Sequence, residues 1–134
     1  MTRREAREMA FVLLFERSFS EEPVADILES AIESRDVQPD AFARELACGA
    51  EEYLVSIDAR IAEHSLNWSK ERISRVAMAV MRTAVYEMLY VDSIPVSVSI
   101  NEAVELAKKY GGDEDPAFVN GVLGGIARQL EAGD

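Results

Sequence analysis

Three arginines lie near the start of this chain, at Arg3, Arg4 and Arg7, with Glu5 between them. Helical positions three and four apart project close together, so a helix starting here presents the three guanidinium groups near one face. Guanidinium groups bind phosphate oxygens through paired hydrogen bonds. Arginines at a chain terminus are more often plain solvated surface, but cations at a helix N-terminus oppose the helix dipole, and that cost is a hint of function.

A second set of candidate residues combines cations with an aromatic ring. Lys108 and Lys109 are adjacent near the end of one expected helix, and Phe118 follows the glycines that end it. Cations beside aromatic rings hold phosphates and stack the bases of single-stranded RNA. Periodicity alone favours a core position for Phe118. The residues by themselves therefore give only a faint indication of nucleic-acid binding.

The sequence offers little for catalysis, metal binding or nucleotide cofactors. Cys48 and His64 are the only residues of their types, and on one continuous helix they lie roughly 24 Å apart, which excludes a catalytic pair. The acidic cluster at 113–115 lacks the spacing of a calcium-binding loop. The glycines at 121–125 follow no expected strand, so they form no phosphate-binding loop. We expect a non-enzymatic protein without metal or cofactor.

Charge and composition limit the class of protein further. The chain has 134 residues, 49% of them hydrophobic, which is typical of one globular domain spanning residues 1–134. Fourteen basic and 25 acidic residues give a net charge of −11, which repels a polyanion as a whole. A single cysteine, no export signal and no long apolar span indicate a cytoplasmic protein without membrane contact.

Apolar residues recur at helical spacing along the whole chain. The pattern predicts helices over about 3–19 and 23–35, followed by one long helix that Pro39 opens and the segment 67–69 ends. It also predicts a central, almost fully buried helix over 76–91 with Ser74 as its cap. Ser99 and Glu102 have the spacing of a capping box, a motif that starts a helix. Asp115 is expected to cap the last helix, with a proline in its first turn.

One signal competes with this all-helical interpretation. Asn120 and Gly121, flanked by apolar residues, are the dipeptide most typical of a tight β-hairpin. Apolar residues continue at helical spacing on both sides of it, and this sustained period outweighs the local signal. We expect an all-α fold of six or seven helices in one compact body.

Three segments carry a resemblance that goes beyond periodicity. They are RREAREMA at 3–10, INEAVELAKKYG at 100–111 and FVNGVLGGIA at 118–127. In this order and spacing, and with NWSKERIS before the central helix and VMRTAVYEML within it, the chain resembles the NusB family of bacterial transcription antitermination factors. The similarity covers nearly the whole chain.

The resemblance implies an all-helical body of two helical subdomains that binds the boxA element of nascent ribosomal RNA leader transcripts. It also implies a partner, the small ribosomal protein NusE, and entry of the pair into an RNA polymerase complex with other Nus factors. Carried over by position, the RNA-binding residues are Arg3, Arg4, Arg7, Lys108, Phe118 and Asn120. Glu5 interrupts the basic motif, and Ala117 stands where a lysine is usual.

The same resemblance implies a surface that faces the partner protein. Glu71 and the exposed edge of the central helix match it, and Phe15 stands where tyrosine is frequent. Ala77 and Met78 replace an acidic and a basic residue, which makes this surface more apolar. The competing hypothesis is a helical protein–protein interaction module without sequence-specific RNA binding, which could use the apolar surface at Ala77 and Met78 to form a homodimer.

Overall fold

The computed structural model describes residues 1–38, 40–66, 68 and 72–133, and it consists of α-helices with no strand in those residues. In chain order the helices are α1 (Arg3–Ser20), α2 (Val24–Arg35), α3 (Ala41–Glu52), α4 (Leu54–Glu63), α5 (Arg75–Tyr90), α6 (Val96–Tyr110) and α7 (Asp115–Glu131). The all-α prediction is confirmed. No helix in these ranges is long and apolar enough to cross a membrane.

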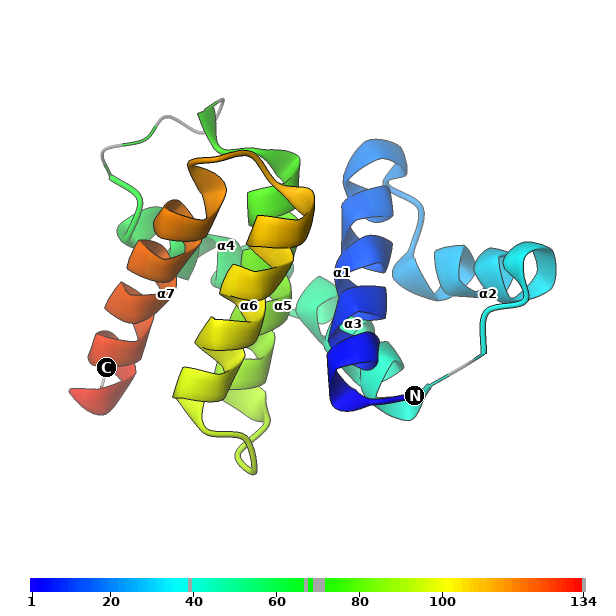
Figure 1. Ribbon diagram of the computed structural model, residues 1–134. Coiled ribbons are helices and arrows are strands. Elements are labelled where there is room, and N and C mark those ends of the chain that lie inside the picture. The colour runs from blue at the N-terminus through cyan, green and yellow to red at the C-terminus, as the bar shows by residue number, and fades with distance from the viewer. Residues whose placement is uncertain (39, 67, 69–71, 134) are drawn as a thin grey trace.

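Helix α5 is the centre of the molecule, as its apolar sequence predicts. It packs against α1, α3, α4, α6 and α7, and its buried side chains lie on every face. In Figure 1, α1, α2 and α3 lie on one side of α5, and α4, α6 and α7 lie on the other. One continuous core cluster nonetheless contains side chains from all of these helices, so burial of α5 holds the two groups together.

The first helix is capped despite its arginines. Thr2 Oγ1 accepts a hydrogen bond from the Glu5 amide at 3.1 Å, and the Glu5 carboxylate accepts one from the Thr2 amide at 2.8 Å. This reciprocal pair is a capping box, and Glu5 adds an acidic group where the helix dipole favours one. Hydrogen bonding to Thr2 also lowers the pKa of Glu5. The predicted cap of α5 is confirmed, since Ser74 Oγ accepts from the Ala77 amide at 2.9 Å.

The prediction of one long helix from Pro39 to the segment 67–69 is wrong, because the chain breaks at Tyr53 into α3 and α4. The apolar period continues across the break, so the sequence pattern does not reveal it. The distance between Cys48 and His64 that was expected from one continuous helix therefore no longer applies. The two side chains have different surroundings. Burial raises the pKa of the half-buried Cys48 thiol, and His64 Nε2 lies 3.1 Å from Gln129 Oε1 on α7. Pro39 lies outside the described residues.

The capping box expected at Ser99 and Glu102 is also wrong. Helix α6 begins earlier, directly after Pro95, so both residues lie inside it and their side chains are free to reach other helices. The expected cap of α7 is displaced by one residue, with Glu114 at the N-cap and Asp115 as the first helical residue. The Asp115 carboxylate instead accepts hydrogen bonds from the Ser74 hydroxyl and the Gly112 amide.

Candidate functional site

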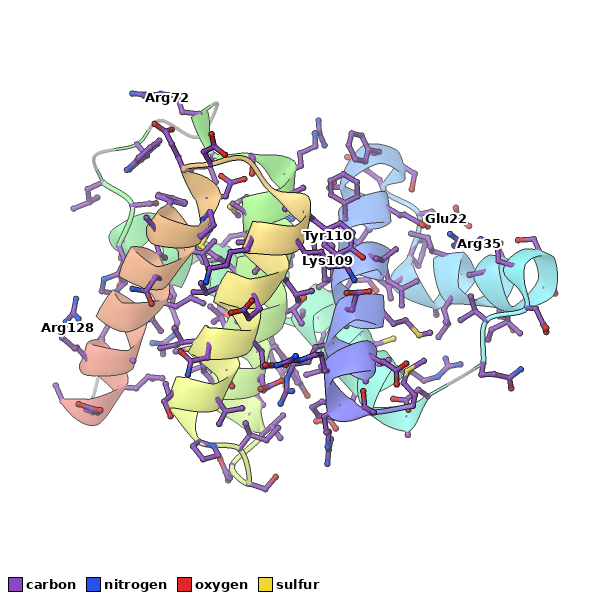
Figure 2. The ribbon with its side chains drawn as sticks, in the orientation of Figure 1. Glu22, Arg35, Arg72, Lys109, Tyr110 and Arg128 are labelled. Carbon is purple, nitrogen blue, oxygen red and sulfur yellow. The ribbon has the colours of Figure 1, made fainter. Side chains whose placement is uncertain are left out.

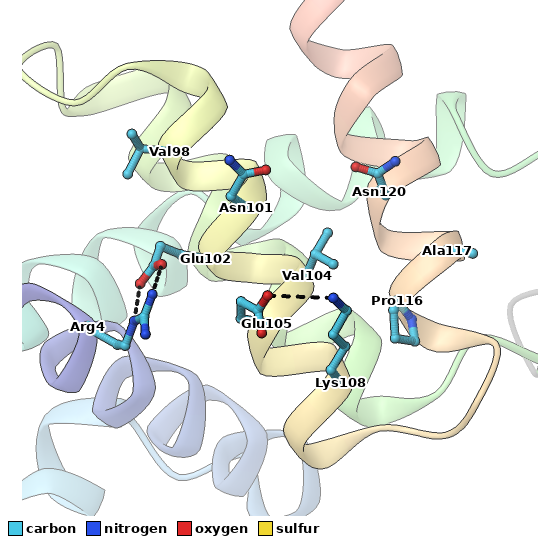
Figure 3. Close-up of a pocket in the computed structure, with 10 residues that line it drawn as sticks. All are labelled: Arg4, Val98, Asn101, Glu102, Val104, Glu105, Lys108, Pro116, Ala117 and Asn120. Atoms are coloured by element: carbon cyan, nitrogen blue, oxygen red, sulfur yellow. Dashed lines mark hydrogen bonds and ion pairs between the residues drawn. The ribbon is translucent and has the colours of Figure 1, made fainter.

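An open groove of about 710 Å³ lies between α6 and α7, with α1 at its edge (Figure 3). It brings together three of the predicted RNA-binding residues from three different helices: Arg4 of α1, Lys108 of α6 and Asn120 of α7. Asn101 of α6 also lines it, and Figure 3 shows the Asn101 and Asn120 amides on facing helices. The groove thus combines two cations with two amides. Each amide can both donate and accept hydrogen bonds.

Arg4 reaches the groove through a long-range ion pair. Its Nε lies 3.0 Å from Glu102 Oε1 and its Nη2 lies 2.8 Å from Glu102 Oε2, which makes the pair bidentate. The Arg4 side chain is 74% exposed, whereas that of Glu102 is 15% exposed. The hydrogen bond from Arg4 lowers the pKa of Glu102 and raises the pKa of Arg4. At neutral pH the pair is therefore fully charged.

Arg7 is not on the surface, although it was predicted to bind RNA. It is 8% exposed, and its Nε lies 2.8 Å from Oε2 of Glu87, a buried residue in the last turn of α5. The other Glu87 oxygen accepts a hydrogen bond from the Ser99 hydroxyl at 2.6 Å. Arg7 Nη1 lies 3.6 Å from Glu102. The guanidinium of Arg7 thus joins α1, α5 and α6, and it is out of reach of a surface ligand while these contacts hold.

Arg3 lies outside the groove. Its guanidinium carbon is 3.9 Å from the centre of the Phe42 ring, so α1 and α3 are joined by a cation–π contact. Arg3 lines a separate small hollow with Asp40 and Glu45. The three arginines therefore do not share one exposed face: Arg4 lies in the groove, Arg7 is buried and Arg3 lies against α3.

The two lysines of α6 are both held by carboxylates. Lys108 Nζ lies 3.6 Å from Glu105 one turn earlier, inside the groove. Lys109 Nζ lies 2.8 Å from Glu8 of α1 and does not line the groove. The hydrogen bond that Lys109 donates to Glu8 raises the pKa of Lys109. Lys108 is thus the lysine positioned to serve a ligand in the groove.

Phe118 and Asn120 lie on different sides of α7, because residues two apart on a helix point about 200° apart. Asn120 lines the groove, whereas Phe118 lines a second hollow of about 600 Å³ with Trp68 and His64. The Phe118 and Trp68 ring centres are 5.0 Å apart. Ala117 lines both hollows, so a ligand crossing α7 at this residue reaches both.

The predicted partner-facing residues are placed unequally. Ala77 is 0% exposed and belongs to the core, so the prediction of an exposed apolar surface at this residue is wrong. Met78 is half-buried and lines an apolar hollow beside α4. Phe15 packs against Phe19 with ring centres 5.0 Å apart, and Phe19 is 62% exposed. Glu71 lies outside the described residues.

Sequence reasoning missed the acids that hold the arginines, Glu87 and Glu102. Their partners are 80 and 98 residues away along the chain, so no local pattern joins them. Glu87 carries one signal: it is a charged residue in the most apolar helix, where an unpaired carboxylate is too costly to bury. Within the described ranges, no group of three or more His, Cys, Asp or Glu side chains could hold a metal ion.

The fold and the groove together define an all-α protein with an open groove where cations, carboxylates and amides from three helices meet. A sequence model of the NusB family matches residues 4–128. The NusB transcription antitermination protein of Bacillus velezensis is 44% identical over 132 residues, covering 98% of this chain and 100% of the relative. That of Bacillus subtilis is 42% identical, covering 98% of each. The chain belongs to the NusB family of transcription antitermination proteins.

Solved structures agree with this assignment. T. maritima NusB superposes with a TM-score of 0.85 at 37% identity, covering 96% of this chain and 92% of that one. The NusB chain of a crystal structure of antitermination factors NusB and NusE with dsRNA superposes with a TM-score of 0.82 at 27% identity. That comparison covers 95% of this chain and 96% of the other.

Proposed function

We propose that this protein binds boxA RNA of nascent ribosomal RNA leader transcripts together with a NusE-type ribosomal protein, and that the pair joins the RNA polymerase antitermination complex. The observation that carries the proposal is the groove in which Arg4, Lys108 and Asn120 meet from α1, α6 and α7. The solved complex of relatives, NusB and NusE with dsRNA, supports both the RNA and the partner. The protein acts by binding and not by catalysis.

The groove residues divide by the part of RNA that they suit. Arg4 and Lys108 are suited to phosphates, which position the strand without reading its sequence. Asn101 and Asn120 are suited to base edges, since an amide offers both a donor and an acceptor. A strand leaving the groove over Ala117 reaches the ring of Phe118 beside Trp68, where a base can stack.

A partner protein is needed because the chain itself repels RNA. The net charge is −11, and the cations of the groove are both paired with acids. The partner surface that we propose lies where α1 ends beside the start of α5. There the rings of Phe15 and Phe19 are in contact, and Arg75 lies over Phe19 at 4.5 Å and donates to the Ser18 carbonyl. Met78 follows Arg75 by one turn of α5.

The test is fluorescence anisotropy of labelled boxA RNA, with and without the NusE-type protein, against scrambled and double-stranded RNA at matched salt. We expect boxA-selective binding that strengthens when the partner is added. Arg4→Ala and Lys108→Ala should each weaken it and flatten its salt dependence by about 0.7 in log–log slope, one phosphate contact each. Arg128→Ala is the matched control, since Figure 2 shows Arg128 on the outer side of α7.

Three outcomes would count against the proposal. If binding ignores both the RNA sequence and the partner, the alternative of an interaction module that binds only protein takes its place. If Arg4→Ala and Lys108→Ala match Arg128→Ala, RNA binds elsewhere on the molecule. A preference for the double-stranded competitor would reject single-stranded boxA as the ligand.

A further inference from the structure

Both cations of the groove are already bound to acids of α6. Glu102 holds Arg4 with two oxygens, at 3.0 and 2.8 Å, and Glu105 lies 3.6 Å from Lys108 (Figure 3). A carboxylate presents two oxygens to a guanidinium much as a phosphate does. The groups that the groove would offer to RNA are therefore occupied by anions of the protein itself.

The two pairs differ in strength and in which partner is fixed. Lys108 and Glu105 are 58% and 59% exposed, so solvent screens their longer contact. Glu102 is only 15% exposed and also faces Arg7 at 3.6 Å, which Glu87 holds in the core. Arg4 is 74% exposed. If the bidentate pair opens, the Arg4 side chain is the one free to move, and the carboxylate stays in place beside Arg7.

We propose that Glu102 is an internal competitor for RNA phosphate, and that Arg4 must exchange this carboxylate for a phosphate when RNA binds. The proposal rests on the RNA-binding function proposed above and adds a specificity-determining residue to it. After the exchange Glu102 remains next to the strand and repels it. A single anion cannot offset that cost, whereas a polyanion that contacts Lys108 at the same time can. Glu102 thus selects for ligands with several adjacent phosphates.

The test is Glu102→Gln, which keeps the side-chain size and leaves the buried pair of Arg7 and Glu87 intact. We expect boxA RNA to bind this variant about two- to five-fold more tightly than it binds the unmodified chain. This change in affinity corresponds to the free energy that one exposed ion pair supplies. In the Arg4→Ala background the same substitution should bring a smaller gain, because the competition for Arg4 is already gone and only the repulsion between Glu102 and the strand is left to remove. Inorganic phosphate, added as a competitor, should displace RNA from the unmodified chain only poorly.

The matched control is Glu16→Gln. It removes the same charge and breaks an exposed ion pair, that of Glu16 with Arg35 at 3.3 Å. Figure 2 shows Arg35 on α2, on the side of the molecule away from α7. We expect this variant to bind RNA like the unmodified chain at physiological salt. Thermal unfolding of Glu102→Gln and Glu16→Gln checks that both are folded. Glu102→Asp is a second variant at the site, because it withdraws the carboxylate from Arg4 while keeping the charge.

Each outcome separates this inference from the proposed function. Weaker binding by Glu102→Gln would overturn the inference, because it would show that the carboxylate holds Arg4 in its binding position. An equal gain in Glu16→Gln would overturn it too, since net charge alone would then explain the effect. If Arg4→Ala itself leaves boxA binding unchanged, the proposed RNA site fails instead.

Discussion

Arg4 and Arg7 are one turn apart on α1, yet they have different environments. Arg7 faces the buried carboxylate of Glu87, and the Ser99 hydroxyl satisfies the second oxygen of that carboxylate. No buried polar side-chain atom in the described part of the chain lacks a hydrogen-bond partner. A buried charge is tolerated only when it is paired in this way. Arg7 is therefore a structural residue, whereas the Arg4 side chain is exposed to solvent.

This difference predicts unequal results for two alanine variants. Arg7→Ala leaves Glu87 buried without its cation, so the free energy of unfolding should fall by about 3 kcal/mol. Arg4→Ala should lower the unfolding midpoint only slightly, because the Arg4 side chain is 74% exposed and solvent screens its pair with Glu102. Urea denaturation followed by circular dichroism measures both. Equal midpoints would contradict the structural role, and partial recovery by Arg7→Met with Glu87→Gln would support it.

The pair of Arg4 and Glu102 also predicts how stability depends on pH. The Glu102 pKa is lowered in the folded protein, first by the hydrogen bond from Arg4 and then by the charges of Arg4 and Arg7. The other charged groups nearby are Glu87, through Arg7, and Glu105 on the same helix. A lowered pKa contributes stability above the unfolded value, and that stability is lost as pH falls through the lowered pKa.

The unmodified chain should therefore be more stable than Glu102→Gln at pH 7, and the difference should shrink as pH falls below about 4.5, the ordinary value for a glutamate. Denaturation in urea at pH 7 and at a pH near 3.5 gives the two differences. A difference that grows towards acid would show that the carboxylate is destabilised in the folded protein.

At the scale of elements, the contact of α3 with α5 depends on a glycine. A Cβ on Gly49 would lie 2.1 Å from the ring of Tyr86, so the two helices are as close as this ring allows. Tyr86 in turn donates to Glu45 of α3 at 3.3 Å. Alanine is the better helix former, but here the gain in helix propensity is smaller than the cost of moving a packed ring.

Gly49→Ala should consequently destabilise the protein by about 1–3 kcal/mol, with the ring of Tyr86 displaced. Gly121→Ala is the control, because that position in α7 has nothing within 4 Å of the added Cβ. It should stabilise the protein by about 0.5–1 kcal/mol. Thermal unfolding of the two variants tests both signs. Stabilisation by both would mean that α3 and α5 adjust freely to the extra methyl group.

The elements also show what the sequence could predict. The helices α5 and α7 follow from long apolar periods, and Ser74 marks the start of α5. The break at Tyr53 could not be predicted, because the apolar stripe runs through it. Helix α6 starts directly after Pro95, so Ser99 lies inside the helix and the capping pattern there predicted the wrong start. At the site, Arg4, Lys108 and Asn120 follow from family resemblance, but the pairing of Arg4 with Glu102 depends on tertiary contacts.

The whole molecule carries a charge of −11, and distance decides how much of it an RNA strand in the groove experiences. The Debye length is about 8 Å at physiological salt and about 30 Å at 0.01 M. Acids on α2 lie on the side of the molecule away from α7 (Figure 1). At physiological salt they are screened from the groove, whereas Glu102 lies in it.

Glu29 and Glu33, one turn apart and exposed on α2, provide the test of this long-range repulsion. Glu29→Gln with Glu33→Gln removes two charges, so RNA should bind measurably tighter at about 0.01 M salt and equally well at about 0.15 M. Glu102→Gln removes one charge and should strengthen binding at both. Anisotropy titrations of the same RNA at the two salt concentrations compare them. A gain for the α2 variant that persists at the higher salt would mean that RNA extends beyond the groove towards α2.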